Sequence, residues 1–167
     1  HDARLPECDG LLLGGGYPEL HADALSANAG MRASIRDAVR SALPTIAECG
    51  GFMYLTDQIG DRAMVGAIRA RCSDRKRLTR FGYATLTAHR DSLLLAAGES
   101  MPVHEFHHWD ADDPGGDMVA EKPSGRRWAC VHATETLYAG FPHLYLPAHP
   151  RAAERFIRKC MERKQGR

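Results

Sequence analysis

The sequence lacks the features that most directly assign a class of function. In 167 residues there is no apolar run approaching the roughly 18 residues of a membrane-spanning helix, and the N-terminus has no charged-then-apolar leader. We therefore expect a soluble, cytoplasmic protein that does not bind membranes. The five cysteines form no C-x-x-C pair and have no regular spacing, which argues against a disulfide framework and against a zinc site: Cys8, Cys49, Cys72, Cys130 and Cys160.

An excess of charge of one sign is also absent. The chain has 22 basic and 21 acidic residues and a net charge of +1, so no global field attracts it to nucleic acid. No G-x-x-x-x-G-K-[ST] phosphate loop occurs in the sequence. With 44% hydrophobic and 26% charged residues, the composition fits one globular domain whose partner is a small molecule or a protein.

The first third of the chain alternates between strand and helix patterns. Residues 9–16, "DGLLLGGG", predict a short buried strand that ends in a glycine turn. Apolar residues at three- and four-residue spacing predict a helix over residues 20–42, with Gly30 an irregular point in its middle. Residues 45–48, "TIAE", predict a second strand, and residues 50–59 a second helix. This order is typical of the α/β class.

The rest of the chain has a different pattern. Five short segments favour strands: "AMVGAIRARC", "GYATLTAH", "SLLLAAG", "VHEFHHW" and "RRWACVHA". Residues 110–117, "DADDPGGD", predict an exposed turn. After Pro150 a final helix is expected, with one apolar face made by Ala153, Phe156, Ile157, Cys160 and Met161.

One cysteine occupies a position with chemical meaning. Cys49 in "PTIAECGGFMYL" lies between a predicted strand and a predicted helix, flanked by Ala47, Gly50 and Gly51. A nucleophile on such a sharp strand-to-helix turn is exposed by a strained backbone that small neighbours tolerate, and the N–H groups at a helix start favour negative charge on the thiol. The residues alone leave open a second interpretation, in which Cys49 is a small buried apolar side chain in an ordinary turn.

Five motifs resemble successive blocks of one known family. "LLLGGGYPEL", "TIAECGGFMYL", "RFGYATL", "HEFHHW" and "AGFPHLYLPAHP" resemble, in the same order, motifs of the class I glutamine amidotransferase domain of the cobyrinic acid a,c-diamide synthase family. The resemblance extends over nearly the whole chain. It implies a flavodoxin-like α/β sheet with flanking helices and a strand-rich insertion.

The resemblance also implies a set of site residues. Cys49 corresponds to the nucleophile and His143 to its acid/base partner, while the backbone N–H groups of Gly15, Gly16 and Gly50 are candidate oxyanion donors that also bind glutamine. Class I amidotransferases usually have a Glu two residues after the catalytic His. Tyr145 occupies that position here, so we expect a Cys–His dyad without the third member of a triad.

For the whole protein, the resemblance implies an ATP-dependent ligase with two parts. Residues 1–167 correspond to the glutaminase domain, and family members have about one further βαβ stretch before "DGLLLGGG", so we expect this chain to be N-terminally incomplete and to lack the synthetase domain. That synthetase domain of the same polypeptide would use ATP and Mg²⁺ and bind the corrinoid. Ammonia from glutamine would then amidate the a- and c-carboxylates of cobyrinate or hydrogenobyrinate in cobalamin biosynthesis. No cofactor and no metal are expected in this chain.

Other interpretations stay open at this point. Within the family, a cobyric acid synthase-type enzyme would use the same thiol on other carboxylates. The chain could also be a non-catalytic docking or regulatory module of the same fold, or a stand-alone cysteine hydrolase. His104, His107 and His108 lie close together in the sequence, but no matching Cys or carboxylate set accompanies them as metal ligands.

Overall fold

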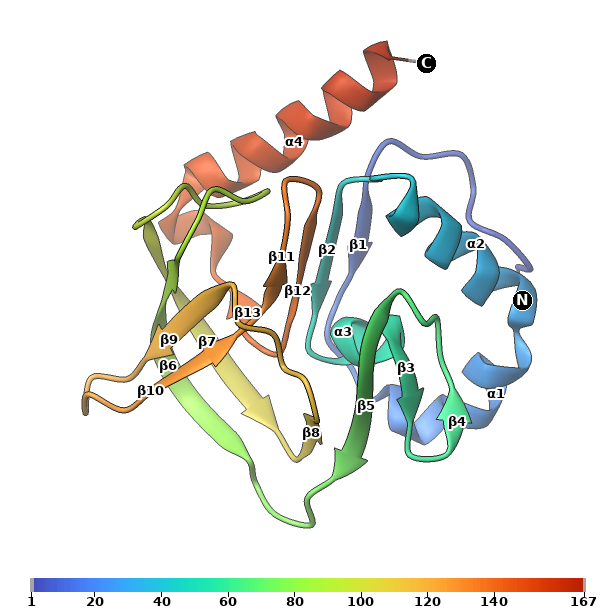
Figure 1. Ribbon diagram of the computed structural model, residues 1–167, viewed down its shortest axis with the longest axis horizontal. Coiled ribbons are helices and arrows are strands. Elements are labelled where there is room, and N and C mark those ends of the chain that lie inside the picture. Colours follow the sequence, from blue (N-terminus) through green and yellow to red (C-terminus); the bar gives the residue numbers. More distant parts are fainter. Residues whose placement is uncertain (1, 167) are drawn as a thin grey trace.

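A computed structural model describes residues 2–166 and contains three sheets within them (Figure 1). The first sheet has the order β1-β2-β12-β11. Its strands are β1 (Leu11–Leu13), β2 (Thr45–Glu48), β12 (Leu137–Gly140) and β11 (His132–Ala133). β1 and β12 both pair with β2 in parallel, and β11 is antiparallel to β12. The carboxyl end of β2 therefore meets the segments that follow its two parallel neighbours.

The second sheet is antiparallel and forms the strand-rich side of the molecule. Its order is β10-β9-β6-β7-β13. The strands are β10 (Arg127–Cys130), β9 (Met118–Glu121), β6 (Arg80–Ala88), β7 (Ser100–His107) and β13 (His143–Leu144). A third sheet, of order β4-β3-β5-β8, contains β4 (Arg62–Ala63), β3 (Thr56–Ile59), β5 (Ile68–Asp74) and β8 (Trp109–Ala111).

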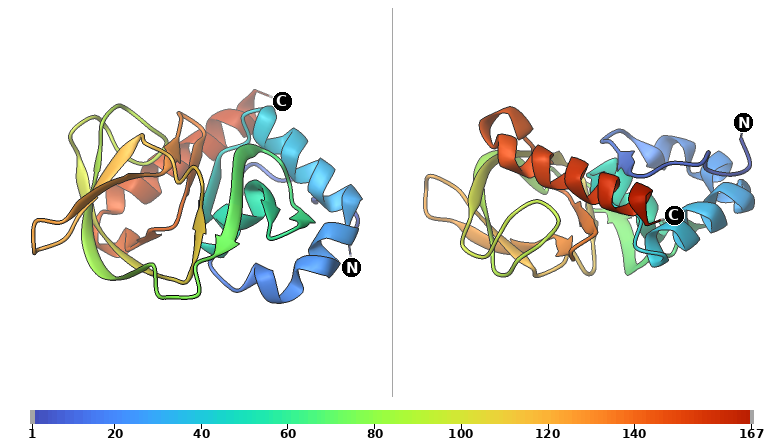
Figure 2. Two further views of the ribbon diagram at one scale, coloured as in Figure 1. Left: turned by 60° about the horizontal axis from the view of Figure 1, so that its bottom comes forward. Right: turned by 90° about the horizontal axis from the view of Figure 1, so that it is seen from above.

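Helices flank these sheets. The N-terminal ones are η1 (Pro18–His21), α1 (Ala22–Ala27), α2 (Ala29–Arg40) and α3 (Gly50–Leu55), and the C-terminal ones are η2 (Leu146–Ala148) and α4 (Pro150–Gln165). In the right-hand view of Figure 2, α4 runs from the strand-rich side towards α2. There Arg163 Nη1 donates a hydrogen bond of 2.8 Å to the Ser41 carbonyl, next to the end of α2.

The first sheet separates two hydrophobic cores. Successive residues of a strand face opposite sides of a sheet. Accordingly, Ile46 of β2 and Tyr138 of β12 are buried in a core shared with the second sheet and α4. Their neighbours Ala47 and Ala139 are buried in a core shared with α3 and the third sheet. A strand that is covered on both faces has buried residues at successive positions, which explains why Thr45, Ile46 and Ala47 of β2 are all buried.

The strand–helix alternation predicted from the sequence is confirmed, with two corrections in the first third. β1 is not a buried strand, because within the described residues it pairs only with β2, and Leu12 is 65% exposed. The helix expected over residues 20–42 divides at Asn28 instead of Gly30. The Asn28 side chain accepts a hydrogen bond of 3.1 Å from the Met31 N–H and caps α2, which runs on through Gly30.

Three further predictions are wrong in detail. The helix expected over residues 50–59 ends at Leu55, and residues 56–59 form β3, because they pair with the third sheet. Residues 92–98 form a loop and not a strand. The three leucines at 93–95 are buried, so this apolar run belongs to a loop that packs into the core. On α4 the buried residues are Ala152 and Phe156, while Ile157 and Met161 are each 55% exposed. Among the described residues, no helix is long and apolar enough to cross a membrane.

A matched pair of leucines tests this assignment of buried and exposed positions. Leu86→Ala removes a fully buried side chain of β6 and leaves a cavity, so we expect it to lower the free energy of unfolding by about 2–5 kcal/mol. Leu12→Ala removes an exposed side chain and is expected to change that free energy by no more than about 0.5 kcal/mol. Urea unfolding of the two variants measures both values, and equal losses would contradict the assignment.

Candidate active site

Cys49 lies at a strained turn between β2 and α3. Its backbone angles are φ 49° and ψ −104°, a region that residues with a side chain rarely occupy. Two hydrogen bonds hold the turn: the Cys49 N–H donates to the Gly140 carbonyl at 2.8 Å, and the Met53 N–H donates to the Cys49 carbonyl at 2.9 Å. This is the geometry of a nucleophile elbow. The prediction that this turn exposes the Cys49 side chain is wrong, since Cys49 is only 7% exposed.

The glycine turn after β1 packs directly against this elbow. A Cβ on Gly50 would meet the Gly16 carbonyl oxygen at 2.7 Å and the ring of Pro18 at 2.9 Å. A Cβ on Gly51 would collide with the Leu13 backbone. Only glycine allows these two main chains to approach so closely. The Gly-Gly that follows Cys49 therefore serves the contact between α3 and the turn after β1.

His143 reaches the same place from the second sheet. β13 pairs with β7, with His143 opposite His104. The Tyr138 hydroxyl donates a hydrogen bond of 2.9 Å to the Pro142 carbonyl, just before His143. A Cβ on Gly15 would come within 2.5 Å of His143 Cε1, so the imidazole lies directly against the glycine turn. The structure thus brings together all five residues expected from the sequence: Cys49, His143, Gly15, Gly16 and Gly50.

Glu48 is a sixth member of this cluster, and it was not predicted from the sequence. One Glu48 carboxylate oxygen lies 3.6 Å from His143 Nδ1, and the other accepts a hydrogen bond of 3.0 Å from the Leu144 N–H. Hydrogen bonding to the Cys49 side chain and then to Glu48 raises the pKa of His143 to about 10, against the opposing effect of burial. His143 is therefore an imidazolium at neutral pH. The sequence contained one indication of this role, because Glu48 directly precedes the candidate nucleophile Cys49.

The three histidines of "HEFHHW" do not share a site. His107 is buried, and its Nε2 lies 2.9 Å from Glu105 Oε2 while its Nδ1 lies 2.6 Å from the Trp109 carbonyl oxygen. Its ring stacks on Phe141 at 4.0 Å between centroids, two residues before His143. The rings of His104 and His108 contact exposed phenylalanines of β6 and β7 instead. Within residues 2–166 no group of His, Cys, Asp and Glu is arranged to hold a metal ion.

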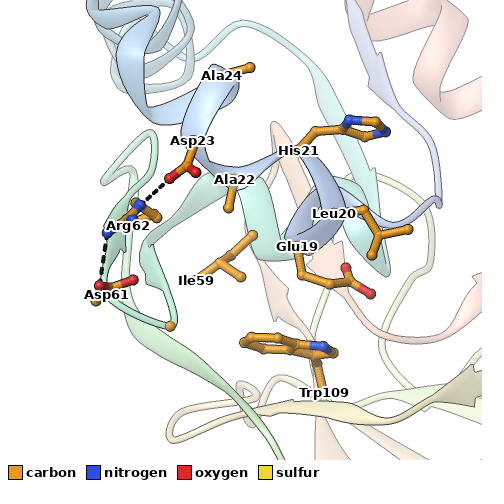
Figure 3. Close-up of a pocket in the computed structure, with 11 residues that line it drawn as sticks. Glu19, Leu20, His21, Ala22, Asp23, Ala24, Ile59, Asp61, Arg62 and Trp109 are labelled. Carbon is orange, nitrogen blue, oxygen red and sulfur yellow. Dashed lines mark hydrogen bonds and ion pairs between the residues drawn. The ribbon is translucent and has the colours of Figure 1, made fainter.

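Cavities lie beside this cluster and away from it. One of about 310 Å³ is lined by residues 12–18 and by Gly50 and Gly51, so it adjoins the elbow. Another, of about 400 Å³, is drawn in Figure 3 and is lined by residues 19–24 and 59–62 and by Trp109. At its edge Arg62 forms ion pairs with Asp23 and with Asp61 (Figure 3). Neither Cys49 nor His143 lines this second cavity.

Comparison with known protein families matches the chain to one of them. The family model described as the CobB/CobQ-like glutamine amidotransferase domain matches residues 1–149. The chain belongs to this family. The resemblance identified from the five sequence motifs is therefore confirmed.

The curated proteins similar to this chain are named as a,c-diamide synthases. The chain is 34% identical to the cobyrinate a,c-diamide synthase of Caldanaerobacter subterraneus subsp. tengcongensis, over 95% of this chain and 37% of that protein. It is 37% identical to the hydrogenobyrinate a,c-diamide synthase of Streptomyces coelicolor, over 95% of this chain and 33% of that protein. The chain thus spans about a third of the length of these relatives.

Solved structures support the fold. A glutamine amidotransferase crystal structure matches with a TM-score of 0.63 at 17% identity, over 92% of this chain and 79% of that chain. A chain in the structure of PurLQS from Thermotoga maritima matches with a TM-score of 0.57 at 12% identity, over 95% of this chain and 81% of that one. The α/β amidotransferase fold expected from the sequence is confirmed. That the chain lacks a first βαβ stretch stays a prediction.

A pair of glycine variants tests the close contact between the glycine turn and His143. Gly15→Ala is expected to displace the imidazole, because the added Cβ would lie 2.5 Å from Cε1. A displacement of about 1 Å costs on the order of 100-fold in rate, so we expect a loss of this size in the labelling of Cys49 by an electrophilic glutamine analogue. Gly14→Ala, whose Cβ would meet no described atom within 4 Å, is the control and is expected to keep the rate. Similar rates for both variants would refute the contact.

Proposed function

We propose that this chain is the glutaminase part of an ATP-dependent amidotransferase, with Cys49 as nucleophile and His143 as general acid and base. The observation that carries the proposal is the strained elbow that places Cys49 in interaction with His143, in a chain of the glutamine amidotransferase family. Strained backbone at a non-glycine residue persists only where the surrounding structure holds it, and such positions cluster at active sites.

The chemistry follows from the protonation of the pair. Because His143 is an imidazolium at neutral pH, it stabilises a Cys49 thiolate beside it. The sulfur attacks the carboxamide carbon of glutamine, and the carbon–nitrogen bond then breaks as His143 donates its proton to the departing ammonia. Water next attacks the γ-glutamyl thioester, with His143 accepting the proton. Glutamate leaves and the thiol is regenerated.

Backbone N–H groups are the candidate donors for the oxyanion of the tetrahedral intermediate. The close approach of the glycine turn to the elbow brings Gly15 and Gly16 from one side and Gly50 from the other. Donors fixed by packing stabilise developing charge without reorganising during the reaction. We therefore assign oxyanion and glutamine binding to these three residues.

We assign the other half of the reaction to a second part of the protein, because the relatives named above are about three times as long as this chain. The relatives named above are synthases of cobyrinate and hydrogenobyrinate a,c-diamides, so we propose that ammonia amidates the a- and c-carboxylates of such a corrinoid acid in cobalamin biosynthesis. The sequence has no phosphate loop, and we assign ATP, Mg²⁺ and corrinoid binding to a synthetase domain of the same polypeptide. We place the protein in the reducing cytoplasm, and no cysteine among the described residues forms a disulfide.

Covalent labelling tests the glutaminase assignment without depending on the synthetase domain. Folded protein is treated with an electrophilic glutamine analogue, with and without excess glutamine, and the modified cysteine is located by intact mass and peptide mapping. We expect a single adduct on Cys49 that glutamine prevents. Cys49→Ala is expected to remain unmodified, and His143→Ala to react on the order of 100-fold more slowly, since general acid–base catalysis contributes about that much.

Two of the other cysteines provide an internal control in the same experiment. Cys72 and Cys130 are buried, and burial raises the pKa of each thiol to about 12, so both should stay unmodified in the folded chain. If Cys49 stays unmodified in folded protein, or if all five cysteines react alike, the glutaminase assignment fails. A docking or regulatory module of the same fold then becomes the better interpretation.

A further inference from the structure

The position that usually holds the third member of the triad is unsuited to that role here. Tyr145 follows β13, is 59% exposed and carries no charge that would favour an imidazolium. The Nδ1 side of the His143 ring is instead occupied by Glu48, at 3.6 Å. The carboxylate is thus supplied from the strand that delivers the nucleophile, and not from the strand that delivers the histidine.

The Glu48 carboxylate makes one contact with the His143 ring and one with the backbone of the next residue, Leu144. One oxygen accepts the Leu144 N–H at 3.0 Å and so attaches β13 to the end of β2, across 96 residues of sequence. The other oxygen faces the imidazole. The Glu48 side chain is 21% exposed and the His143 side chain 34%, so water screens their interaction only in part. One side chain therefore contacts both the backbone beside His143 and the Nδ1 side of its ring.

We propose that Glu48 is the positioning residue of this active site, orienting His143 through Nδ1 so that Nε2 is left to exchange protons with Cys49 and the substrate. A carboxylate at Nδ1 sets the tautomer of a catalytic histidine and stabilises the imidazolium that the reaction needs. The assignment rests on the proposed function, since it presumes that His143 transfers protons. It replaces the dyad expected from the sequence with a triad whose third member precedes the nucleophile.

Few other titratable groups surround this imidazole. Among the described residues, Gly15 of the turn after β1 lies against the ring and has no titratable side chain, and His104 of β7 is its partner in the strand register. From β2 and the elbow come Glu48 and Cys49, which both raise the pKa of His143. Removing the charge at Glu48 must therefore lower this pKa, whereas removing a distant carboxylate must not.

Glu48→Gln tests the assignment, because the amide oxygen can still accept the Leu144 N–H while the charge beside Nδ1 is lost. We expect the pKa of His143, followed by NMR of the imidazole with His143→Ala to assign the signal, to fall below that of the wild type. The maximal rate of Cys49 labelling is expected to fall about 10-fold or more, with the half-saturating concentration of the analogue within about twofold. Since the imidazolium keeps the thiolate active, the alkaline limit of the labelling rate should move to lower pH.

Three further variants test whether the effect of Glu48→Gln is specific to the charge at position 48. Glu48→Asp retains the charge and is expected to restore part of the rate and of the pKa. Glu135→Gln removes an exposed carboxylate elsewhere and serves as the charge control, and Tyr145→Phe tests the usual third position. Both controls are expected to match the wild type. Thermal melting checks that each variant is folded; if Glu48→Gln does not fold, the same NMR titration of Glu48→Asp decides, with an unchanged His143 pKa overturning the assignment.

The outcomes separate this inference from the proposed function. If Cys49 is labelled as expected but the pKa of His143 and the pH profile are unchanged in Glu48→Gln, the glutaminase assignment stands and the role of Glu48 is wrong. If the pKa falls but wild-type Cys49 is never labelled, Glu48 does orient His143 and the glutaminase assignment is wrong. Loss of rate in Tyr145→Phe equal to that in Glu48→Gln would also overturn the inference.

Discussion

The backbone conformation of Cys49 is the constraint on which the site depends. A residue with φ 49° and ψ −104° carries strain of about 1–3 kcal/mol, which the surrounding structure must offset. β2 lies between two parallel neighbours, and the hydrogen bond from Cys49 to Gly140 continues its pairing with β12 into the turn. The reversal presses α3 against the turn after β1, where Gly50 and Gly51 leave no room for a side chain. The conformation of the elbow therefore requires glycine at positions 50 and 51.

The strand-rich segment completes the site from the other side. Residues 56–133 include the second and third sheets almost entirely, and β7 provides the edge on which β13 and His143 are placed. Buried polar contacts brace this arrangement, since His107 is held by Glu105 and stacks on Phe141 near His143. A strand-rich segment inserted between two parts of the α/β sheet therefore positions His143, the proposed acid and base.

Local patterns predicted part of this molecule well. The strand, elbow and glycine pair around Cys49 could be read because each depends on near neighbours in the sequence, and Pro150 marks the start of α4 for the same reason. Predictions failed where tertiary pairing outweighs periodicity. Residues 56–59 continue an apolar helical pattern but are drawn into β3 by their pairing with β5, and Leu12 is exposed because β1 lies at the edge of its sheet among the described residues.

The α/β class and the family could be predicted from the sequence, as could the proposal of Cys49, His143 and the neighbouring glycines as site residues, because those signals lie in short contiguous motifs. The burial of Cys49, the exposure of Tyr145 and the contact of Glu48 with the histidine, nearly a hundred residues away, are known from the tertiary structure alone. The physical reason is that these contacts depend on the register of β13 on β7 and on the packing of two sheets. Neither this register nor this packing can be predicted from a local pattern of residues.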